Sequence, residues 1–248
     1  MSEWTIEYTN FAPWLETLNE VHGSTGNGYF CNRTAIPWEP SKIDIHYPAT
    51  YLAGGYNRVS SQVGDRMLEN EDLVNWPNWQ HIRFKFDDGD WFSLHDPDIE
   101  ILDFKRTYNL KNATNHFDVR VKDSAGNITR IHSDSFAHMK NANFGALGLE
   151  IEPENWVGNM TVESGIDGNV FNDNVARYRE LESRHIAVTN SGRDPKTGAL
   201  WLDCESSQAK QRVVEGVRTR FFLNGKAVEV SKENKPVQRD AGIFETFN

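Results

Sequence analysis

Hydrophobic and polar residues alternate along much of the chain after residue 79, which is the pattern of β-strands that bury one face. Residues 82–86 read Ile-Arg-Phe-Lys-Phe, and the turn sequence at 87–90 predicts a hairpin with residues 91–94. Residues 117–121 and 128–131 alternate in the same way around a polar turn at 123–127. They predict a second hairpin.

Further strands are predicted at residues 147–151 and 160–166, and a hairpin at 217–230 turns at Asn224-Gly225. Helical spacing is limited to two places, residues 14–21 after Pro13 and residues 175–182. Many strands without long alternating helices favour an all-β fold. We therefore expect one domain over residues 1–248, a large antiparallel β-sandwich with a few short helices.

The last residues of the sequence resemble a strand that stops abruptly. Residues 243–248 read as a strand, Ile-Phe-Glu-Thr-Phe-Asn, with no turn or polar tail after it. A strand cut off in this way would leave backbone donors and acceptors at an open sheet edge. We expect the chain to be truncated within its architecture.

Charge and composition exclude some partners. Hydrophobic residues make up 38% of the 248 positions, enough for a sizeable core, and 26 basic against 36 acidic residues give a net charge of −10. Such a surplus opposes binding to a nucleic acid or an anionic membrane. No signal peptide or spanning segment is evident, and the two cysteines, Cys31 and Cys204, are expected to be reduced, so a cytoplasmic location is predicted.

A glycine turn near the amino end is a candidate sugar-contacting segment. Asn27, Gly28 and Tyr29 can bring backbone amides close to a hydroxyl group, and the cation Arg33 follows. The alternative is an ordinary loop that enters a strand, because glycine turns are common wherever chains reverse. The segment lacks the Lys-Ser/Thr of a phosphate-binding loop.

Aromatic residues at positions 51–79 offer a second candidate surface. Tyr51, Tyr56, Trp76 and Trp79 could stack on the C–H faces of a sugar. The alternative is that most of these rings are structural, because aromatic side chains dominate protein cores.

Catalytic and metal-binding patterns are weak. Inverting sugar chemistry needs a proton-donating carboxyl group with a second carboxylate or a bound phosphate, and no acidic pair stands out. The acidic groups at 87–90 and 167–174 fit turns better than a catalytic or calcium site. His132 and His138 lack metal-ligand spacing, and no Gly-x-Ser-x-Gly motif occurs.

Several blocks together resemble a known family. Residues 18–33 with Asn27-Gly28-Tyr29, residues 47–58 with Gly54-Gly55-Tyr56, and residues 71–79 with Trp76-Pro77-Asn78-Trp79 are similar, in this order, to the amino-terminal domain of glycoside hydrolase family 65. The resemblance spans about residues 4–185. It implies a galactose-mutarotase-like supersandwich that accompanies a separate catalytic (α/α)6 barrel, which this chain is expected to lack.

The resemblance also implies a function. Family members are inverting phosphorylases or hydrolases of α-glucosidic disaccharides, with no cofactor and with inorganic phosphate as co-substrate when they are phosphorylases. We expect this chain to support the barrel and its substrate pocket without turning over substrate alone. Its expected partners are the barrel, the disaccharide through the parent enzyme, and a second copy in a homodimer.

No catalytic residue is transferred from the family. The substrate-cleft candidates are Asn27, Gly28, Tyr29, Arg33, Tyr56, Trp76 and Trp79. Two rival hypotheses remain: a free-standing carbohydrate-binding sandwich, and a truncated product that associates through its open edge.

Overall fold

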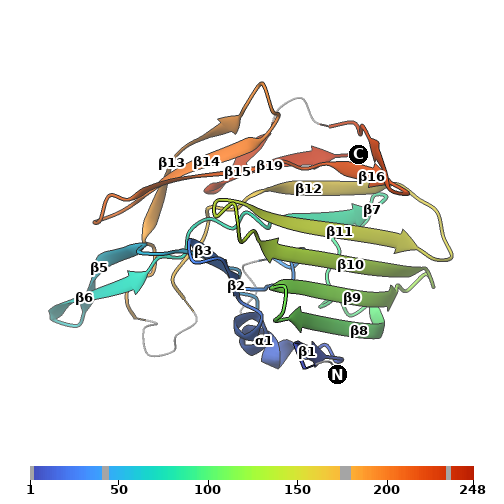
Figure 1. Cartoon of the computed structure of the whole chain (residues 1–248), viewed down its shortest axis with the longest axis horizontal. Helices are drawn as coiled ribbons and strands as arrows, with labels where there is room; N and C mark the ends of the chain where they lie inside the picture. The colour runs from blue at the N-terminus through green and yellow to red at the C-terminus, as the bar shows by residue number, and fades with distance from the viewer. Residues whose placement is uncertain (1–2, 41–44, 174–179, 233–235) are drawn as a thin grey trace. The chain divides into compact units, whose positions relative to one another are not determined.

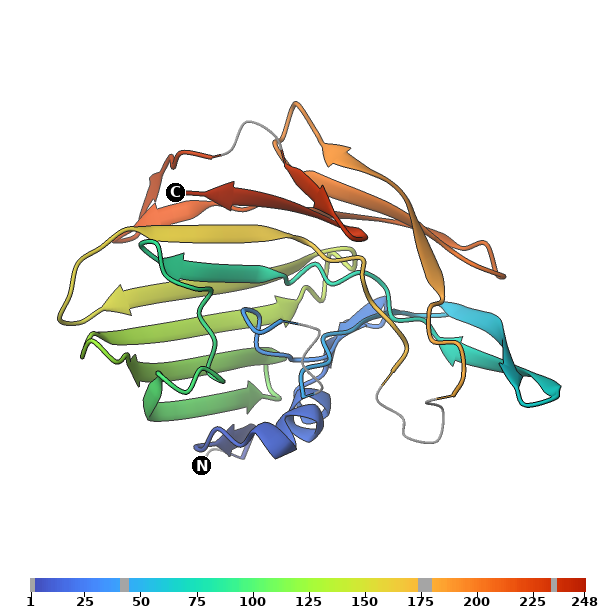
Figure 2. The same cartoon turned by 180° about the vertical axis from the view of Figure 1, so that it is seen from behind.

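The computed structural model describes residues 3–40, 45–173, 180–232 and 236–248. Antiparallel strands are its main elements (Figures 1 and 2). The chain divides into two compact units, which are described separately below: unit 1 contains residues 1–48 and 85–160, and unit 2 contains residues 49–84 and 161–248. The expected antiparallel all-β class is confirmed, whereas the expectation of a single domain stays a prediction.

A five-stranded antiparallel sheet forms most of unit 1. Its strands, in spatial order, are β1 (Thr5–Tyr8), β8 (Glu100–Asn109), β9 (Thr114–Lys122), β10 (Ile128–Ala137) and β11 (Gly145–Pro153). The hairpin predicted around residues 123–127 is confirmed, since β9 and β10 pair with Ile131 opposite Val119. The strand predicted at 147–151 is also confirmed as part of β11.

One face of this sheet builds the core of unit 1, and the other faces solvent. Alternate residues of β9, among them Phe117 and Val119, are buried, whereas their neighbours are partly exposed. Trp38, from the loop after β3, packs its ring against Phe117 and Phe92 at 6.5 Å between centroids. The short strands β2 (Thr25–Gly26) and β3 (Phe30–Asn32) pair in the same unit.

The hairpin predicted between residues 82–86 and 91–94 does not form. Residues 82–86 are strand β7 (Ile82–Phe86), whose neighbour in the sheet is β12, and residues 91–94 have no strand conformation. Glu39 accounts for the difference: its carboxylate accepts hydrogen bonds from the Ser93 hydroxyl at 2.6 Å and from the Leu94 backbone at 2.7 Å. A side chain, not a partner strand, therefore satisfies this backbone.

Unit 2 contains the remaining strands. The hairpin of β5 (Tyr56–Val63) and β6 (Arg66–Leu73) follows β4 (Thr50–Leu52). A four-stranded sheet has the order β18 (Val237–Arg239), β19 (Gly242–Phe247), β12 (Met160–Ile166) and β7. A three-stranded sheet consists of β13 (Ile186–Arg193), β14 (Leu200–Ser206) and β15 (Arg212–Val217).

The last hairpin forms where the sequence predicts a turn. Strands β16 (Phe221–Leu223) and β17 (Lys226–Val228) flank Asn224 and Gly225, whose φ angles are 51° and 75°. Positive φ at both central positions is the geometry of a two-residue hairpin turn, which Asn-Gly adopts with little strain.

The final strand was expected at an open edge, and this expectation is wrong. Strand β19 pairs with β12 on one side and with β18 on the other. Ile243 is completely buried and Phe244 is 4% exposed, so the strand is central in both pairing and packing.

Among the described residues, no helix is long and apolar enough to cross a membrane.

The predicted helix at residues 14–21 is confirmed. Its polar side is buried and its apolar side is exposed, which is the reverse of a usual surface helix. A 3₁₀ turn, η1 (Pro13–Leu15), leads into α1 (Glu16–His22), with Pro13 at the start. The buried members of α1 are Glu16, Asn19 and Glu20. The helix predicted at 175–182 lies largely outside the described residues.

Candidate functional site

The polar side of α1 points into unit 1 and meets buried cations there. Glu16 and Arg106 are both fully buried and form an ion pair at 2.5 Å, with the Arg106 guanidinium 4.6 Å from the centre of the Phe117 ring. The buried Tyr108 hydroxyl donates to the Asn19 carbonyl oxygen at 2.6 Å, and burial raises the pKa of that phenol. These contacts fix the helix to the sheet.

Glu20 organises the next part of this interior. Its carboxylate accepts from the Tyr47 backbone at 3.0 Å, contacts His46 Nδ1 at 3.0 Å, and lies 3.5 Å from the Arg33 guanidinium. Arg33 also donates to the Thr17 carbonyl oxygen and lies over the Tyr47 ring. The predicted substrate-cleft candidate Arg33 is therefore engaged inside unit 1.

A pair of histidines continues from Glu20 towards Glu39. His46 Nε2 and His95 Nε2 are 2.8 Å apart, so one of them carries the shared proton. Burial lowers the pKa of His95, with a smaller contribution from His46. Burial raises the pKa of Glu39 although Ser93 and Leu94 donate hydrogen bonds to it. One ligand atom from each of these three groups lies within 4.8 Å of the others, but the Glu39 carboxylate already accepts from Ser93 and Leu94, and His46 Nδ1 is held by Glu20.

The glycine turn singled out in the sequence is a tightly bonded loop. Asn27 Oδ1 accepts from the backbones of Tyr29 and Phe30 at 3.0 and 3.1 Å, and its Nδ2 donates to the carbonyl oxygens of His138 and Ala142 at 2.9 Å each. Asn27 thus ties its own loop to the β10–β11 loop. Gly28 has a φ of 86°, which disfavours other residues there.

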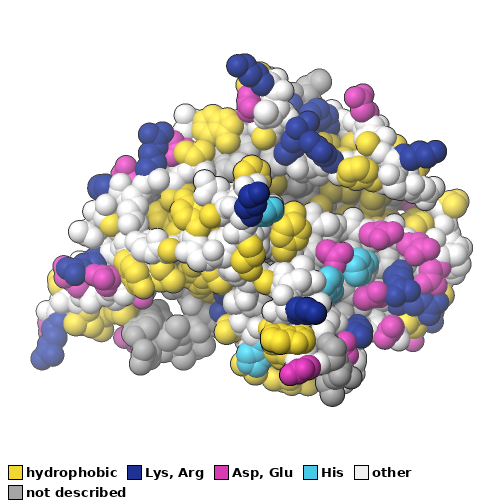
Figure 3. All heavy atoms as spheres, viewed as in Figure 1, with side chains coloured by type: hydrophobic (Ala, Val, Ile, Leu, Met, Phe, Trp, Pro, Cys, Tyr) yellow, Lys and Arg dark blue, Asp and Glu magenta, His cyan; other side chains and the backbone are white. Residues whose placement is uncertain are grey.

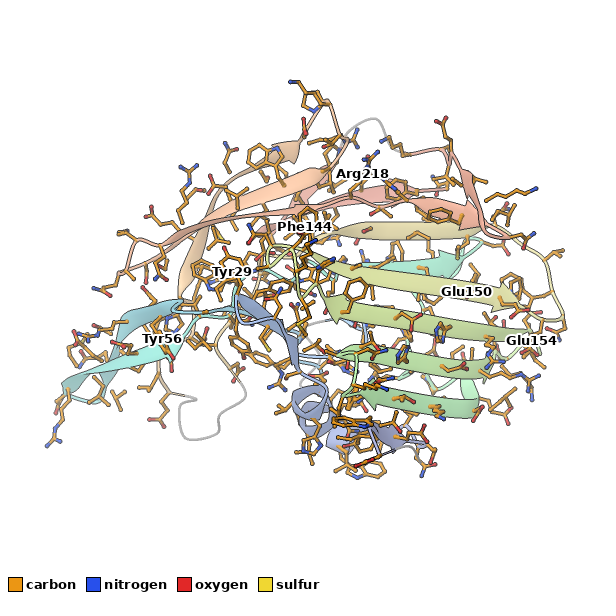
Figure 4. All side chains as sticks on the ribbon, in the orientation of Figure 1. Tyr29, Tyr56, Phe144, Glu150, Glu154 and Arg218 are labelled. Atoms are coloured by element: carbon orange, nitrogen blue, oxygen red, sulfur yellow. The ribbon has the colours of Figure 1, made fainter. Side chains whose placement is uncertain are left out.

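These two tied loops present aromatic and apolar side chains to solvent. Tyr29 is 47% exposed and Phe144 is 65% exposed. Figure 4 labels both residues. Phe136 and Met139 on the β10 side are also exposed. We call Tyr29, Phe136, Met139 and Phe144 the loop patch, and it is a surface on which a sugar ring or a protein segment could pack.

A second apolar surface of unit 1 lies on α1 and its approach. Trp14 is 77% exposed and Leu18 is 51% exposed, and Leu15 and Val21 are exposed as well. Figure 3 shows hydrophobic side chains gathered around this part of the molecule at the lower edge. We call these four residues the helix patch. A helix that buries its carboxylates and exposes its apolar stripe reverses the usual arrangement.

The other predicted cleft residues lie in unit 2. Trp76 is completely buried in the core of that unit, together with Val74, Ile166 and Leu202. Its ring therefore offers no surface to a ligand in this structure. Trp79 is partly buried, and Tyr56 is 52% exposed at the start of β5.

Unit 2 has an open pocket of about 470 Å³ beside the β5–β6 hairpin. Its lining residues are Arg58, Val59, Ser60, Glu69, Glu182, Arg184, Ser207 and Gln208. Both arginines are already engaged, since Arg58 donates to Glu71 at 2.6 Å and Arg184 donates to Asn169 at 2.9 Å. Both cations among the described lining residues therefore already have a partner, and a phosphate would have to compete for them.

A buried asparagine, Asn57, bonds to two of the residues that line this pocket, Ser207 and Gln208. Asn57 Nδ2 lies 3.0 Å from the Ser207 hydroxyl and 3.1 Å from His185 Nδ1, and its Oδ1 accepts from the backbones of Gln208 and Ala209. Burial lowers the pKa of His185, although Asp72 opposes this. The Asn57 amide therefore contacts both the serine hydroxyl and the histidine ring.

Glu163 on β12 is a buried carboxylate of unit 2 with several charged partners. Its oxygens contact Arg83 at 2.8 Å, Arg239 at 2.6 Å and His81 at 3.1 Å. Burial by itself would raise the pKa of Glu163, but the hydrogen bonds from His81, Arg239 and Arg83 outweigh burial and hold the pKa well below its usual range. Glu163 stays ionised, whereas a general acid must carry a proton.

The sequence did not indicate these interior ion pairs. Glu16, Glu20 and Glu163 read as ordinary charged surface positions, although four-residue spacing places Glu16 and Glu20 on one side of a helix opposite the apolar residues. The arrangement as a whole can stabilise the units and offer apolar surfaces. Among the described residues, burial raises the pKa of Glu39 and of Glu215, and neither carboxyl group lines the pocket beside the β5–β6 hairpin.

Comparisons with known proteins place the chain in a family. The model of the glycosyl hydrolase family 65 N-terminal domain matches residues 6–247. An uncharacterized glycosyl hydrolase of Mycobacterium tuberculosis is 34% identical over 226 residues, which are 91% of this chain and 17% of that protein. The trehalose 6-phosphate phosphorylase of Lactococcus lactis is 31% identical, over 96% of this chain and 29% of that protein.

A solved structure has the same fold. A protein titled "Putative kojibiose phosphorylase from human microbiome" superposes with a TM-score of 0.76 at 14% sequence identity, over 98% of this chain and 30% of the other. This likeness confirms the predicted β-sandwich fold class. This chain spans under a third of the length of each of these relatives. It belongs to glycosyl hydrolase family 65, and residues 6–247 form the N-terminal domain of that family.

Proposed function

We propose that this domain is a non-catalytic module of an enzyme that acts on α-glucosidic disaccharides, and that the catalytic carboxylate lies in a separate barrel domain. The helix patch would pack against another part of the parent protein, and the loop patch would form one wall of the substrate pocket. The family match and the greater length of the relatives support this division of labour.

The reversed orientation of α1 is the observation that carries the proposal. Its carboxylates are held inside by Arg106 and Arg33, so the helix cannot turn its apolar residues inward without breaking buried ion pairs. Covering an apolar side chain such as Leu18 is worth about 1.5–3 kcal/mol. A partner surface that is itself apolar would therefore gain stability by covering the helix patch.

The substrate class follows from the relatives. Those named are a trehalose 6-phosphate phosphorylase and several kojibiose phosphorylases. We propose an α-linked glucose disaccharide as substrate of the parent enzyme, with inorganic phosphate as co-substrate if it is a phosphorylase. Two groups of this domain would face the sugar. They are the exposed Tyr29 ring and the backbone at Gly28, where no atom lies within 4 Å of the position of a Cβ.

A chimera tests the role of the helix patch. The N-terminal domain of the Lactococcus lactis phosphorylase is replaced by this chain, and phosphorolysis is measured. We expect an active chimera that loses at least tenfold in kcat when Trp14→Ser and Leu18→Ser are combined. Phe222→Ser on β16 is the matched control and should leave activity unchanged, because Phe222 is an aromatic residue of unit 2 whose 61% exposure lies between those of Leu18 and Trp14. Full activity of the double variant would contradict the proposal.

The loop patch also favours a second candidate function, a carbohydrate-binding sandwich that works alone. Calorimetric titration of the isolated chain with maltose, trehalose or kojibiose distinguishes the two. The module hypothesis predicts no saturable binding without the barrel. Saturable binding that is lost in Tyr29→Ala would favour the free-standing binding protein.

The compartment and the oligomer are further proposals. Cys31 and Cys204 are both free thiols, which suits the reducing cytoplasm. A homodimer of the parent enzyme is proposed as well. Light scattering of the isolated chain measures its own association, and a stable monomer would place any dimer contact outside this domain.

A further inference from the structure

The solvent face of the unit 1 sheet carries a square of two histidines and two aspartates. His116 faces Asp134 across the β9–β10 pair, and Asp118 faces His132 one step further along. Their neighbours in each strand are buried, so all four side chains lie on the outer face of the sheet. The strand pairing therefore fixes the positions of the four side chains, which a group of carboxylates on a loop would lack.

The polar atoms of the square converge on Asp134. His116 Nδ1 contacts Asp134 Oδ1, and His132 Nε2 lies 3.0 Å from Asp134 Oδ2. His132 Nδ1 lies 3.7 Å from Asp118 Oδ2. One ligand atom from each of His116, His132 and Asp134 lies within 4.8 Å of the others. A single ion could therefore reach all three.

A second pair of side chains fixes the proton on His116. The Thr114 hydroxyl donates to Asn112 Oδ1 at 2.8 Å, so its oxygen is left to accept from His116 Nε2, also at 2.8 Å. In a neutral imidazole whose Nε2 carries the proton, Nδ1 has only a lone pair. That lone pair points at the Asp134 carboxylate.

Two acceptors that face each other need a cation between them. A proton on His116 is one solution, and a metal ion that replaces this proton is the other. His132 presents the same situation, because carboxylate oxygens lie near both of its ring nitrogens and a neutral imidazole has only one N–H.

We propose that His116, His132 and Asp134 bind a Zn²⁺ ion, with Asp118 as an adjacent carboxylate and Thr114 as the positioning residue for His116. Imidazole nitrogens with a carboxylate are preferred ligands of zinc, and a second group that orients a ligating histidine is the usual accompaniment. The ion would clamp β9 to β10 on the side opposite the core and leave room for water or a partner's ligand.

The charges around the square are mixed, and Arg130 already binds Asp118, whereas Asp134 contacts the two histidines. Glu150 is the partner of His132 on β11 and adds a further carboxylate on this face (Figure 4). The nearby cations already have partners: Arg130 binds Asp118 at 2.7 Å, and Arg120 binds Glu154 at 2.6 Å. Lys105, opposite Asp118 on β8, pairs with Glu7 at 2.9 Å.

Calorimetric titration of the whole 248-residue chain with zinc sulfate tests the proposal. We expect one saturable equivalent, with affinity reduced at least tenfold in His116→Gln and in His132→Gln. Thr114→Val should weaken binding about tenfold while leaving all ligands in place. His22→Gln is the matched control, because His22 is exposed and bonds Tyr8 elsewhere in the unit. Circular dichroism checks that each variant is folded.

Nuclear magnetic resonance of the histidine rings in the unmodified chain gives a second readout. Zinc should shift the Nδ1 resonance of His116 and leave Nε2 protonated. The melting temperature should rise with zinc in the wild-type chain and not in the double variant His116→Gln/His132→Gln. Absence of saturable binding, equal affinity in that double variant, or ring shifts confined to other histidines would each overturn the proposal.

Discussion

Carboxylates in the interior of unit 1 and on its solvent face have different surroundings. Glu16 and Glu20 are fully buried, and each has a guanidinium within 3.5 Å, from Arg106 and Arg33 respectively. Asp134 is about half exposed, and within the described residues its charged contacts are histidines alone. The interior pairs serve folding, because their charges are already compensated. The solvent face retains a capacity to bind a cation.

The largest effect should come from breaking an interior pair. Arg106→Met leaves the Glu16 carboxylate buried without its cation, which should lower the free energy of unfolding by about 3–5 kcal/mol. Urea denaturation followed by tryptophan fluorescence measures it. A loss below about 1 kcal/mol would show that water already shields this pair. The interior pair would then contribute no more to stability than a surface pair.

Glu163 in unit 2 should show a smaller loss with a defined pH dependence. Glu163→Gln removes the charge that Arg83, Arg239 and His81 share, and we expect a loss of about 2–3 kcal/mol at pH 7. The folded pKa of Glu163 is depressed, so its contribution is complete above the unfolded value near 4.3 and declines as pH falls below it.

The difference in stability between wild type and Glu163→Gln should therefore shrink between about pH 5 and pH 3. Urea midpoints at these two values and at pH 7 measure it. A difference that stays constant across this range would mean that the carboxylate is not held ionised by its three partners.

The loop tie should contribute less. Asn27→Ala removes hydrogen bonds to two backbone amides and two carbonyl oxygens at a partly exposed site, and we expect a loss of about 2 kcal/mol. Hydrogen exchange should quicken in residues 138–144, and the change should be confined to this loop and residues 27–30. Unchanged exchange there would mean that the loops hold their positions independently.

The smallest effect is expected at a surface pair. Arg120→Gln removes a bidentate contact with Glu154 on the solvent face of the sheet, and the expected loss is below about 1 kcal/mol. The same urea measurement compares it with Arg106→Met. If Arg120→Gln lowered the free energy of unfolding as much as Arg106→Met, surface and interior ion pairs would not differ in their contribution to stability.

The sequence predicted the strands whose alternation is regular and failed where a side chain replaced a strand partner. The β9–β10 hairpin and the Asn224-Gly225 turn follow from period-two patterning and local turn chemistry. Residues 91–94 were predicted to be the returning strand of a hairpin, but the distant Glu39 accepts the hydrogen bond of the Leu94 backbone. Strand β19 was expected at an edge because no turn or polar tail follows it, but both of its partners, β12 and β18, come earlier in the chain.

The candidate site shows the same limit. Asn27, Gly28 and Tyr29 were recognised as one turn, yet the bond that ties them to residues 138 and 142 is a contact between distant segments that no local pattern records. Trp76 and Tyr56 are both aromatic in sequence, whereas one is fully buried and the other exposed. Spacing could have shown that Glu16 and Glu20 share a helix side, but not that this side would be the buried one.

The most direct test of the central claim is an activity assay of the purified 248-residue chain. Maltose, trehalose and kojibiose are each supplied with inorganic phosphate, and glucose 1-phosphate is measured beside a kojibiose phosphorylase as positive control. Because the proposed function places the catalytic carboxylate in a separate barrel domain, we predict no product from this chain. Steady turnover by the isolated chain would contradict the account.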